Sequence, residues 1–394
     1  MRHPSRQWLV GAALMLGLIA LLGSVWLLRP ARAVPAQARL SVSQALSDQS
    51  AGFARVTAPR PFSFPADHGP HPEYKTEWWY YTGNLDTVDG RHFGFQLTFF
   101  RSGLRANPTE RPSRWATRNV YMAHFALTDV AGARFFAVDR FSRDGAGLAG
   151  AQADPFRVWI GDWQAGGDPA EGTRLRAAQG DIAIDLVARS DKPPVLQGDR
   201  GYSRKSVEPG AASYYYSLTR MVTRGTLSLA GTTFDVSGLA WLDREWSTSV
   251  LARDQVGWDW FALQLADGSE LMAFQIRLRN GAIEPLSHGA LVAPDGRSIT
   301  LRREQIQIAV LDHWTSPHTG TRYPSRWRLR VPEQQLDLTI EPWLKDQELR
   351  VSFVYWEGAV RIQGTHAGRP VSGVGYVELT GYGELSGSAP QSVR

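Results

Sequence analysis

The sequence predicts an all-β protein made of antiparallel hairpins, and two observations indicate this fold class. Among its 394 residues the chain has 38 Gly, 23 Pro, 15 Trp, 12 Tyr and 16 Phe, a composition typical of turns and aromatic strands rather than of long helices. Short runs also alternate apolar and polar residues and are separated by Asp-Gly or Asn-Gly, which favour tight hairpin turns. With 43% hydrophobic residues, the chain can build one large or two ordinary packed domains.

The first 33 residues are typical of an export signal. Arg2 and Arg6 precede an uncharged apolar run over residues 8–28, and Ala31-Arg32-Ala33 then provides a small-residue cleavage site. The run is also long enough to span a bilayer, so an uncleaved N-terminal anchor is the alternative to a cleaved signal peptide. Because the positive flank stays inside in both cases, we expect a periplasmic protein or one anchored to the outer face of the inner membrane.

The charge balance argues against a nucleic-acid partner. The formal net charge is +5, but four arginines and no acid lie in the first 33 residues, and removing them leaves 39 basic against 38 acidic residues. Binding to phosphates requires a concentrated basic patch, which this interspersed pattern does not offer. The sequence contains no cysteine, which excludes disulfides, thiolate catalysis and Cys-ligated zinc.

Strands are expected from Phe62 onward, after a polar tether over residues 34–60. In the run 92–99, positions 93, 95, 97 and 99 are all Phe or Leu, which places them on one face of a strand. The expected hairpin turns are Asp89-Gly90, Asp267-Gly268, Asn280-Gly281 and Asp295-Gly296.

Two domains are expected along the folded part of the chain. An irregular stretch around residues 192–206 separates the first series of hairpins from a second series that begins near Val236. Two sheets or barrels of about 150 residues fit ordinary domain sizes better than one very large sheet. We therefore expect an N-terminal domain over residues 61–237 and a C-terminal domain over residues 238–394.

The common catalytic motifs are missing from the sequence. It contains no G-x-S-x-G elbow, no H-E-x-x-H pair and no P-loop. Residues 145–150 spell G-x-G-x-x-G, but no helical pattern follows them, so we interpret this stretch as a loop rather than a dinucleotide site. The nine histidines are scattered, and neither a metal nor a cofactor is predicted.

Acidic residues embedded in aromatic strands are the most informative feature. Strand alternation over residues 238–247 places Trp241, Asp243 and Glu245 on one side of the strand. Two neighbouring carboxyls on an aromatic face cannot both ionise without cost, and burial raises the pKa further, so one could stay protonated and act as a general acid. The structural alternative is that both carboxyls pair with Arg244, which lies between them in sequence.

Four further acids repeat this arrangement. Asp259 is flanked by two indoles, and Glu77, Glu357 and Glu378 each adjoin aromatic residues. A buried acid in an arginine-rich β-protein is more often part of a structural ion pair than of a catalytic site. Most of the tryptophans are likewise expected in the core.

Seven of these segments, taken in order, resemble the secreted AttH-like proteins, a family similar to the carotenoid 1,2-hydratases or hydroxyneurosporene synthases. The segments are Glu77 to Leu85, Ala123 to Asp129, Ala212 to Ser217, Gly238 to Ser249, Gly257 to Ala262, Tyr355 to Val360 and Gly375 to Tyr382. The resemblance covers residues 60–385 and implies two tandem lipocalin-like, or calycin, antiparallel β-barrels. This agrees with the hairpin pattern derived from the residues alone.

The resemblance also implies a class of activity. The carotenoid branch adds water to a double bond without a cofactor, and related lipocalin-like proteins include a fungal hydratase for a plant-defence compound. Members of the secreted branch are described as predicted secreted hydrolases and are often encoded beside ABC-transporter permeases. The export signal and the sequence Asp243-Arg244-Glu245-Trp246 place this chain with the secreted branch.

Acid-catalysed hydration of an isoprenoid or polyketide-like substrate is therefore the expected function. Such a reaction needs a protonated carboxyl, a dry pocket and aromatic faces that stabilise a carbocation. Asp243 is the expected acid, with Glu245 or Asp259 as the base that holds the water. The expected substrate-binding residues are Trp78, Trp79, Tyr81, His124, Tyr216, Arg244, Trp246, Trp258 and Trp260.

Two other functions remain open at this stage. The protein could be a non-catalytic envelope lipocalin that binds a hydrophobic ligand and presents it to an inner-membrane ABC transporter. A secreted hydrolase is the weaker alternative, because the sequence offers neither a nucleophile nor a metal constellation and would have to use a carboxylate-activated water. In all three cases the expected partner is a hydrophobic small molecule, and contact with a membrane is expected only through an uncleaved N-terminal segment.

Overall fold

The computed structural model describes residues 50–107, 112–248, 251–252 and 254–385. The signal or anchor expected over residues 1–33, and most of the expected tether, lie outside these ranges. The described helical elements are all short: η1 (Ala66–His68), η2 (Gly145–Gly147), η3 (Arg303–Gln305), η4 (Pro332–Gln334) and α3 (Tyr382–Leu385). Within the described residues, no helix has the length and apolar character needed to cross a membrane.

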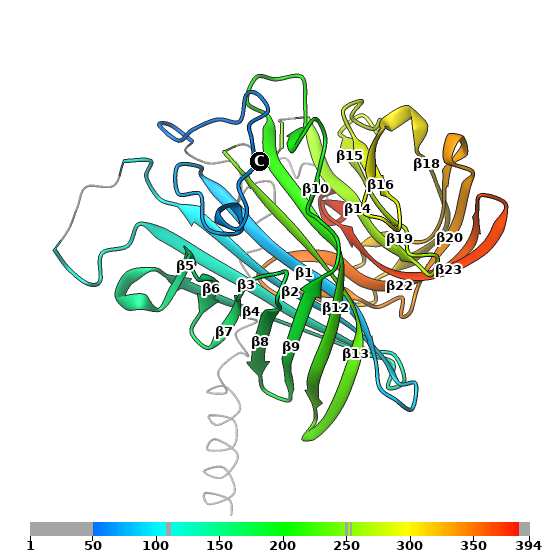
Figure 1. Cartoon of the computed structure of the whole chain (residues 1–394), viewed down its shortest axis with the longest axis horizontal. Helices are drawn as coiled ribbons and strands as arrows, with labels where there is room; N and C mark the ends of the chain where they lie inside the picture. The colour runs from blue at the N-terminus through cyan, green and yellow to red at the C-terminus, as the bar shows by residue number, and fades with distance from the viewer. Residues whose placement is uncertain (1–49, 108–111, 249–250, 253, 386–394) are drawn as a thin grey trace, which may run out of the picture. The chain divides into compact units, whose positions relative to one another are not determined.

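The first sheet contains thirteen antiparallel strands and is curled into a barrel (Figure 1). Its order is β4-β3-β2-β1-β13-β12-β9-β8-β7-β6-β5, and two short strands, β10 and β11, pair with β12. The strands are β1 (Thr76–Asp86), β2 (His92–Gly103), β3 (Asn119–Asp129), β4 (Arg134–Arg143), β5 (Ala149–Ala153), β6 (Phe156–Ile160), β7 (Trp163–Gly166), β8 (Thr173–Gln179), β9 (Ile182–Ser190), β10 (Val195–Leu196), β11 (Tyr202–Arg204), β12 (Ala212–Leu229) and β13 (Thr232–Ser247).

The second sheet contains ten strands in the order β17-β16-β15-β14-β23-β22-β20-β19-β18, with β21 paired to β22. The strands are β14 (Gln255–Leu265), β15 (Glu270–Leu278), β16 (His288–Val292), β17 (Ser298–Arg302), β18 (Gln307–Thr315), β19 (Arg322–Val331), β20 (Leu336–Pro342), β21 (Glu348–Arg350), β22 (Val354–His366) and β23 (Arg369–Leu379). The prediction of an all-β fold with two lipocalin-like sheets is confirmed.

The local turn predictions are also confirmed. Gly90, Gly268, Gly281 and Gly296 each lie between consecutive antiparallel strands and have φ angles of +82° to +87°. Glycine adopts this left-handed conformation without a steric penalty, so these positions close the hairpins β1–β2, β14–β15, β15–β16 and β16–β17. The glycine-rich residues 145–150 form η2 and the start of β5, and no helix of the Rossmann type follows them.

The change from the first sheet to the second differs from the expected domain boundary. The position 237/238 falls inside β13, which pairs with β1 without interruption as far as Ser247 and also pairs with β12 on both sides of this position. Gly238 is an ordinary member of this ladder, opposite Leu85, so the glycine does not end the strand. The irregular stretch 192–206 supplies β10 and β11 to the first sheet. The chain therefore changes sheets between Ser247 and Gln255.

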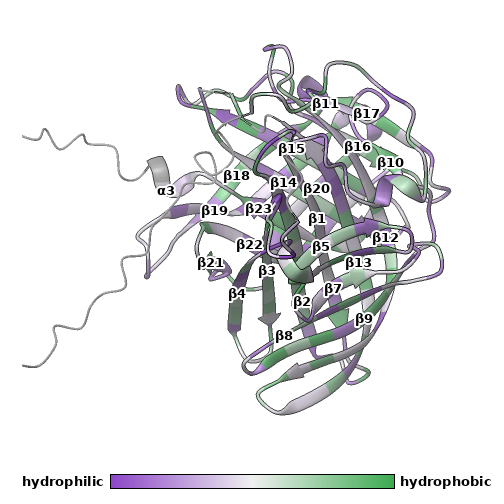
Figure 2. Ribbon diagram, turned by 90° about the vertical axis from the view of Figure 1, so that its left-hand side faces the viewer, coloured by the Kyte–Doolittle hydropathy of each residue, from purple (hydrophilic) through white to green (hydrophobic). Residues whose placement is uncertain are grey.

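The three largest groups of buried apolar residues organise the packing of the described residues. One fills the first barrel and includes Trp79 and Trp246; a second fills the other barrel and includes Trp327. A third lies where the two sheets meet and includes Tyr80 and Trp260. Strands at the meeting face, such as β1, are buried on both sides. Outer strands such as β8 and β9 alternate buried and exposed residues, visible in Figure 2 as alternating hydrophobic and hydrophilic segments.

Candidate functional site

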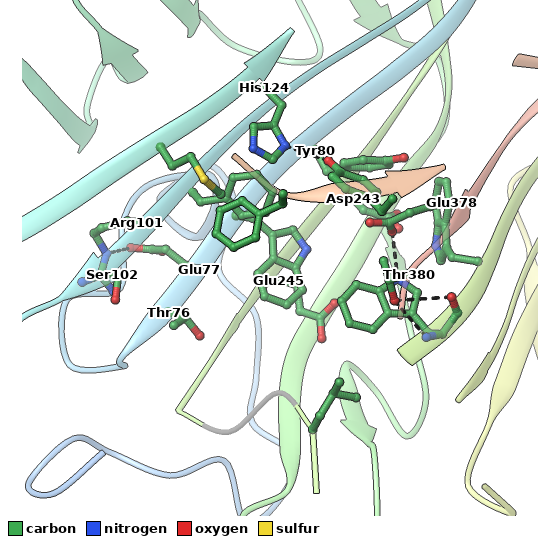
Figure 3. Close-up of a pocket in the computed structure, with 18 of the residues that line it drawn as sticks. Thr76, Glu77, Tyr80, Arg101, Ser102, His124, Asp243, Glu245, Glu378 and Thr380 are labelled. Carbon is green, nitrogen blue, oxygen red and sulfur yellow. Dashed lines mark hydrogen bonds and ion pairs between the residues drawn. The ribbon is translucent and has the colours of Figure 1, made fainter. Parts of the chain in front are cut away.

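A cavity of about 240 Å³ lies between the two sheets rather than inside either barrel (Figure 3). The first sheet contributes side chains from β1, β2, β3, β4, β12 and β13, and the second contributes β14, β15, β22 and β23. The wall is rich in aromatic rings, which belong to Trp78, Tyr80, Phe100, Phe141, Tyr215, Trp258, Trp260, Phe274, Phe353 and Tyr355. An aromatic wall of this kind suits an apolar ligand.

One row of residues in register crosses the first sheet beneath this cavity. His124 of β3 pairs with Thr98, Thr98 with Tyr80, Tyr80 with Asp243, and Asp243 with Ser217 of β12. Paired residues on neighbouring strands point to the same face of a sheet. The row therefore places an imidazole and a carboxyl in one cavity wall, with two strands between them.

Asp243 is a buried carboxyl whose hydrogen-bond partners are all neutral. It accepts hydrogen bonds from the Tyr215 hydroxyl, from Ser217 Oγ at 2.5 Å and from Trp241 Nε1 at 2.7 Å. Burial raises the pKa of Asp243 to about 7, and these three donors only partly offset that effect. Asp243 can therefore both hold and release a proton near neutral pH.

Glu245 lies next along the same face and is paired with a cation. Its Oε1 atom is 3.0 Å from Lys205 Nζ, and both side chains are buried. The Lys205 ammonium also lies over the rings of Tyr215 and Phe274, 5.2 and 4.5 Å from their centroids. The two acids of β13 therefore differ in their surroundings: Glu245 lies beside a cation, whereas the hydrogen-bond donors of Asp243 are neutral.

The second sheet faces this wall with another acidic pair. Glu357 and Glu378 are directly opposite each other on β22 and β23, and Glu378 is in register with Trp260. Glu357 accepts a hydrogen bond from the Tyr80 hydroxyl at 2.7 Å, and Glu378 accepts one from Trp258 Nε1 at 2.9 Å. Burial and the neighbouring carboxyl raise the pKa of Glu357 well above its usual range, and burial raises the pKa of Glu378 to about 7.

His124 is buried in the same cavity wall. Its Nδ1 atom lies 2.7 Å from the Tyr355 hydroxyl oxygen, whereas its Nε2 atom has no hydrogen-bond partner in the described part of the chain. Burial lowers the pKa of His124 to about 4, so the imidazole is neutral at neutral pH.

The structure brings together six of the predicted site residues. Asp243, Glu245, Trp78, His124, Trp258 and Trp260 all line the cavity. Five predicted substrate-binding residues lie outside its wall, namely Trp79, Tyr81, Tyr216, Arg244 and Trp246. On their strands they alternate with cavity-facing residues, and the four aromatic ones pack in the interior of the first barrel. The alternation across residues 241–246 was predicted correctly, but the predicted set included residues from both faces.

Asp259 also differs from its predicted role as a base. It lies between two cavity tryptophans in sequence and therefore points to the other face of β14. There it accepts hydrogen bonds from the Tyr382 hydroxyl and Gln275 Nε2, both at 2.9 Å, and lies 3.4 Å from Arg277 Nε. Asp259 is therefore part of a structural cluster outside the cavity.

The structural alternative in which Arg244 pairs with Asp243 and Glu245 is contradicted. Arg244 forms its ion pair with Glu77 and lies over the ring of Trp79, 4.0 Å from the centroid. Glu77 also pairs with Arg101. Although burial alone would raise its pKa, the two guanidinium groups hold the pKa of Glu77 well below the usual range. This cluster therefore braces β1 against β2 and β13, and leaves Asp243 without a guanidinium partner.

Several cavity residues were absent from the predicted site. The local sequence could have identified Glu378 as a site residue, because Glu378 follows an aromatic strand pattern like that of Asp243. Tyr215 belongs to a run of three tyrosines whose facing side the sequence alone could not assign. Lys205 comes from an irregular loop and had no local signal. Among the described residues, no group of three or more His, Cys, Asp or Glu side chains is arranged to hold a metal ion.

The fold and the cavity together define a lipocalin-like protein with two β-barrels and a pocket between them. The chain belongs to the AttH-like family, whose model matches residues 55–382. A search of curated protein sequences found no match.

Three solved structures are similar to this chain over most of its length. An AttH protein from Nitrosomonas europaea shares 36% identity, covers 84% of this chain and 99% of its own, and has a TM-score of 0.75. Kievitone hydratase from Nectria haematococca shares 13% identity over 84% of this chain and 96% of its own, with a TM-score of 0.63. CghA, solved with Sch210972, shares 15% identity over 87% of this chain and 97% of its own, with a TM-score of 0.53. The last two likenesses concern the fold.

Proposed function

We propose that this protein is an exported, cofactor-independent hydratase-type enzyme that adds water to a double bond of an apolar isoprenoid or polyketide-like substrate. The observation that carries the proposal is Asp243, a buried carboxyl with a pKa of about 7, held by neutral donors in an aromatic cavity. A carboxyl of this kind is protonated often enough at neutral pH to act as a general acid. Kievitone hydratase, which shares the fold, supports this class of reaction.

The chemistry follows from the positions of the side chains. The π electrons of the double bond take the proton of Asp243, which forms a C–H bond and leaves a carbocation and an Asp243 carboxylate. The faces of Trp258 and Trp260 stabilise the positive charge. A water molecule then forms the C–O bond and gives a proton to the Glu245 carboxylate. Transfer of that proton back to Asp243 restores the resting state, so one water is consumed per turnover.

The dimensions of the cavity limit the substrate. A cavity of about 150 Å³ is enough to hold benzene, and this one has about 240 Å³. It therefore suits a compact ring compound or one end of a longer apolar molecule. The apolar N-terminal run over residues 8–28 supports export to the periplasm or the outer face of the inner membrane.

An alternative function is ligand transport, which the largely apolar cavity wall also supports. In this case the protein is an envelope lipocalin that delivers a hydrophobic ligand to an inner-membrane ABC transporter. The buried acids are then structural. Asp243, for example, holds neighbouring side chains in position through its three hydrogen bonds.

Turnover in water enriched in oxygen-18 separates the two functions. The apolar molecule that co-purifies with the exported protein is identified by mass spectrometry, and then incubated with enzyme in water enriched in oxygen-18. Hydration adds one labelled water to the molecule, and Asp243→Asn is expected to abolish this product while ligand binding and melting temperature are retained. Asp259→Asn is the matched control, since it changes a buried aspartate outside the cavity. An unlabelled, unchanged ligand, or full turnover by Asp243→Asn, would overturn the proposal.

A further inference from the structure

The unpartnered nitrogen of His124 is the feature of the cavity that the proposed reaction does not use. The side chain is only 1% exposed, and its Nε2 atom has no hydrogen-bond partner in the described ranges. Leaving a buried polar atom without a partner costs free energy, so such atoms in native proteins usually meet a ligand or an ordered water. The Nδ1 atom is already held by the Tyr355 hydroxyl, which fixes the direction of Nε2.

The surroundings of the imidazole favour a ligand over a water. The rings of Phe100 and Phe353 lie beside it, with centroids 5.3 and 6.1 Å from that of His124. These rings offer no hydrogen bonds, whereas a stable buried water needs two to four polar partners. An oxygen atom that belongs to an apolar molecule avoids this difficulty, because the rest of the molecule packs against the rings.

The position of His124 also separates it from the proposed chemistry. The register row runs from Asp243 through Tyr80 and Thr98 to His124, which is three strand spacings, or about 14 Å. In Figure 3, Asp243 lies beside Glu378, and His124 lies on the far side of Tyr80. The attacking water must lie next to the carbon that Asp243 activates. His124 is therefore too distant to hold that water.

We infer that the ligand of this cavity is an oxygenated apolar compound, and that its hydroxyl or carbonyl oxygen binds His124 Nε2. A plain hydrocarbon would leave this nitrogen unpaired. The inference rests on the proposed function only where it places a double bond near Asp243. The binding of the oxygen is inferred from the geometry of His124 alone. The Tyr355 hydroxyl can donate to Nδ1 or accept from it, so Nε2 is a donor in one tautomer and an acceptor in the other, and a hydroxyl fits both.

The binding of three matched probes tests this inference. 2-Naphthol, 2-methoxynaphthalene and 2-methylnaphthalene share one ring system, but the first donates and accepts hydrogen bonds, the second only accepts, and the third does neither. Equilibrium dialysis against the full chain gives the three dissociation constants. We expect 2-naphthol to bind about tenfold or more tightly than 2-methylnaphthalene, although it is the less hydrophobic compound. The affinity of 2-methoxynaphthalene then identifies the tautomer.

Variants assign the preference to His124. His124→Phe keeps the aromatic ring and should abolish the preference for 2-naphthol, while His124→Gln should retain part of it. Met122→Leu, on the same face of β3, is the control and should leave the preference unchanged. Asp243→Asn should abolish turnover but not the preference, which distinguishes failure of this inference from failure of the proposed function. Absence of a preference in the native protein, its survival in a folded His124→Phe variant, or its loss in Asp243→Asn would each overturn the inference.

Discussion

Glu357 of β22 and Glu378 of β23 lie directly opposite each other at the cavity wall, and each accepts a hydrogen bond from a neutral donor. Like charges directly opposite on neighbouring strands are destabilising, and burial increases that cost. At least one of the two carboxyls therefore keeps its proton at neutral pH. Asp243 and Glu378 line the cavity, and Glu357 lies opposite Glu378 on the neighbouring strand; the pKa values of all three acids are raised.

Glu378→Gln is expected to flatten the dependence of stability on pH. Burial raises the folded-state pKa of Glu378 to about 7, above its ordinary value of 4.5, so the folded protein binds the proton more tightly than the unfolded chain. The resulting stability is fully present below pH 4.5 and is lost as the pH rises through 7. Between pH 4 and pH 8, the unfolding free energy of the variant should therefore rise relative to that of the native protein by about 3 kcal/mol.

Urea denaturation at intervals from pH 4 to pH 8 measures this effect. Glu171→Gln, in the exposed turn between β7 and β8, is the control and should follow the native profile. Parallel profiles for Glu378→Gln and the native protein would contradict this prediction, because they would show that the pKa of Glu378 is the same in the folded and unfolded states.

The hydration rate is expected to fall at alkaline pH. Because burial raises the pKa of Asp243 to about 7, the acid is protonated below that pH and becomes a carboxylate above it. The rate constant should be nearly independent of pH below 7 and decrease about tenfold per unit well above it. Turnover measured from pH 5 to pH 9, in the native protein and in Glu378→Gln, separates the two acids. A rate that increases with pH would contradict the role of Asp243 as the acid.

Much of the fold could be predicted because its signals are local. The turn at Gly90 requires only a glycine in a left-handed conformation between two alternating runs. The division of residues 241–246 into two faces requires only the two-residue period of a strand. Both features are properties of a few neighbouring residues, so a single sequence contains them.

The location of the cavity could not be predicted in the same way. Strand β1 and the second half of β13 are buried on both faces, so hydrophobicity does not tell which face meets the other barrel. Trp79 and Trp78 are adjacent aromatic residues, yet the first fills a barrel and the second lines the cavity. Lys205 reaches Glu245 only through the packing of distant segments. Such contacts depend on how the two sheets meet.

Glu77→Gln is expected to destabilise the protein strongly. Glu77 is fully buried and pairs with both Arg101 and Arg244, so the variant leaves two buried guanidinium groups without their carboxylate. Breaking a buried pair in this way costs about 3–5 kcal/mol.

The stabilisation by Glu77 also depends on pH, because the two arginines outweigh burial and lower its pKa. This stabilisation is present above pH 4.5 and is lost on acidification through the lowered folded-state pKa. Urea denaturation at pH 7 should show this loss, and the exposed Glu73→Gln should not. Equal stability of the two variants would contradict the bracing role.

Asp259→Asn is expected to change stability without changing the site. Asp259 lies between Trp258 and Trp260 in sequence, but it faces Tyr382 and Arg277 on the other side of β14. The variant weakens the contact with Arg277 and keeps an oxygen for the Tyr382 hydroxyl, so a loss of about 1–2 kcal/mol in unfolding free energy is expected. Ligand affinity and turnover should stay within twofold of the native values, whereas Asp243→Asn should lose turnover at nearly constant stability. Thermal melting and product formation, measured on both variants side by side, test whether Asp259→Asn changes mainly stability and Asp243→Asn mainly turnover. Loss of turnover in a fully folded Asp259→Asn protein would restore Asp259 to the chemistry and remove the reason for assigning the base to Glu245.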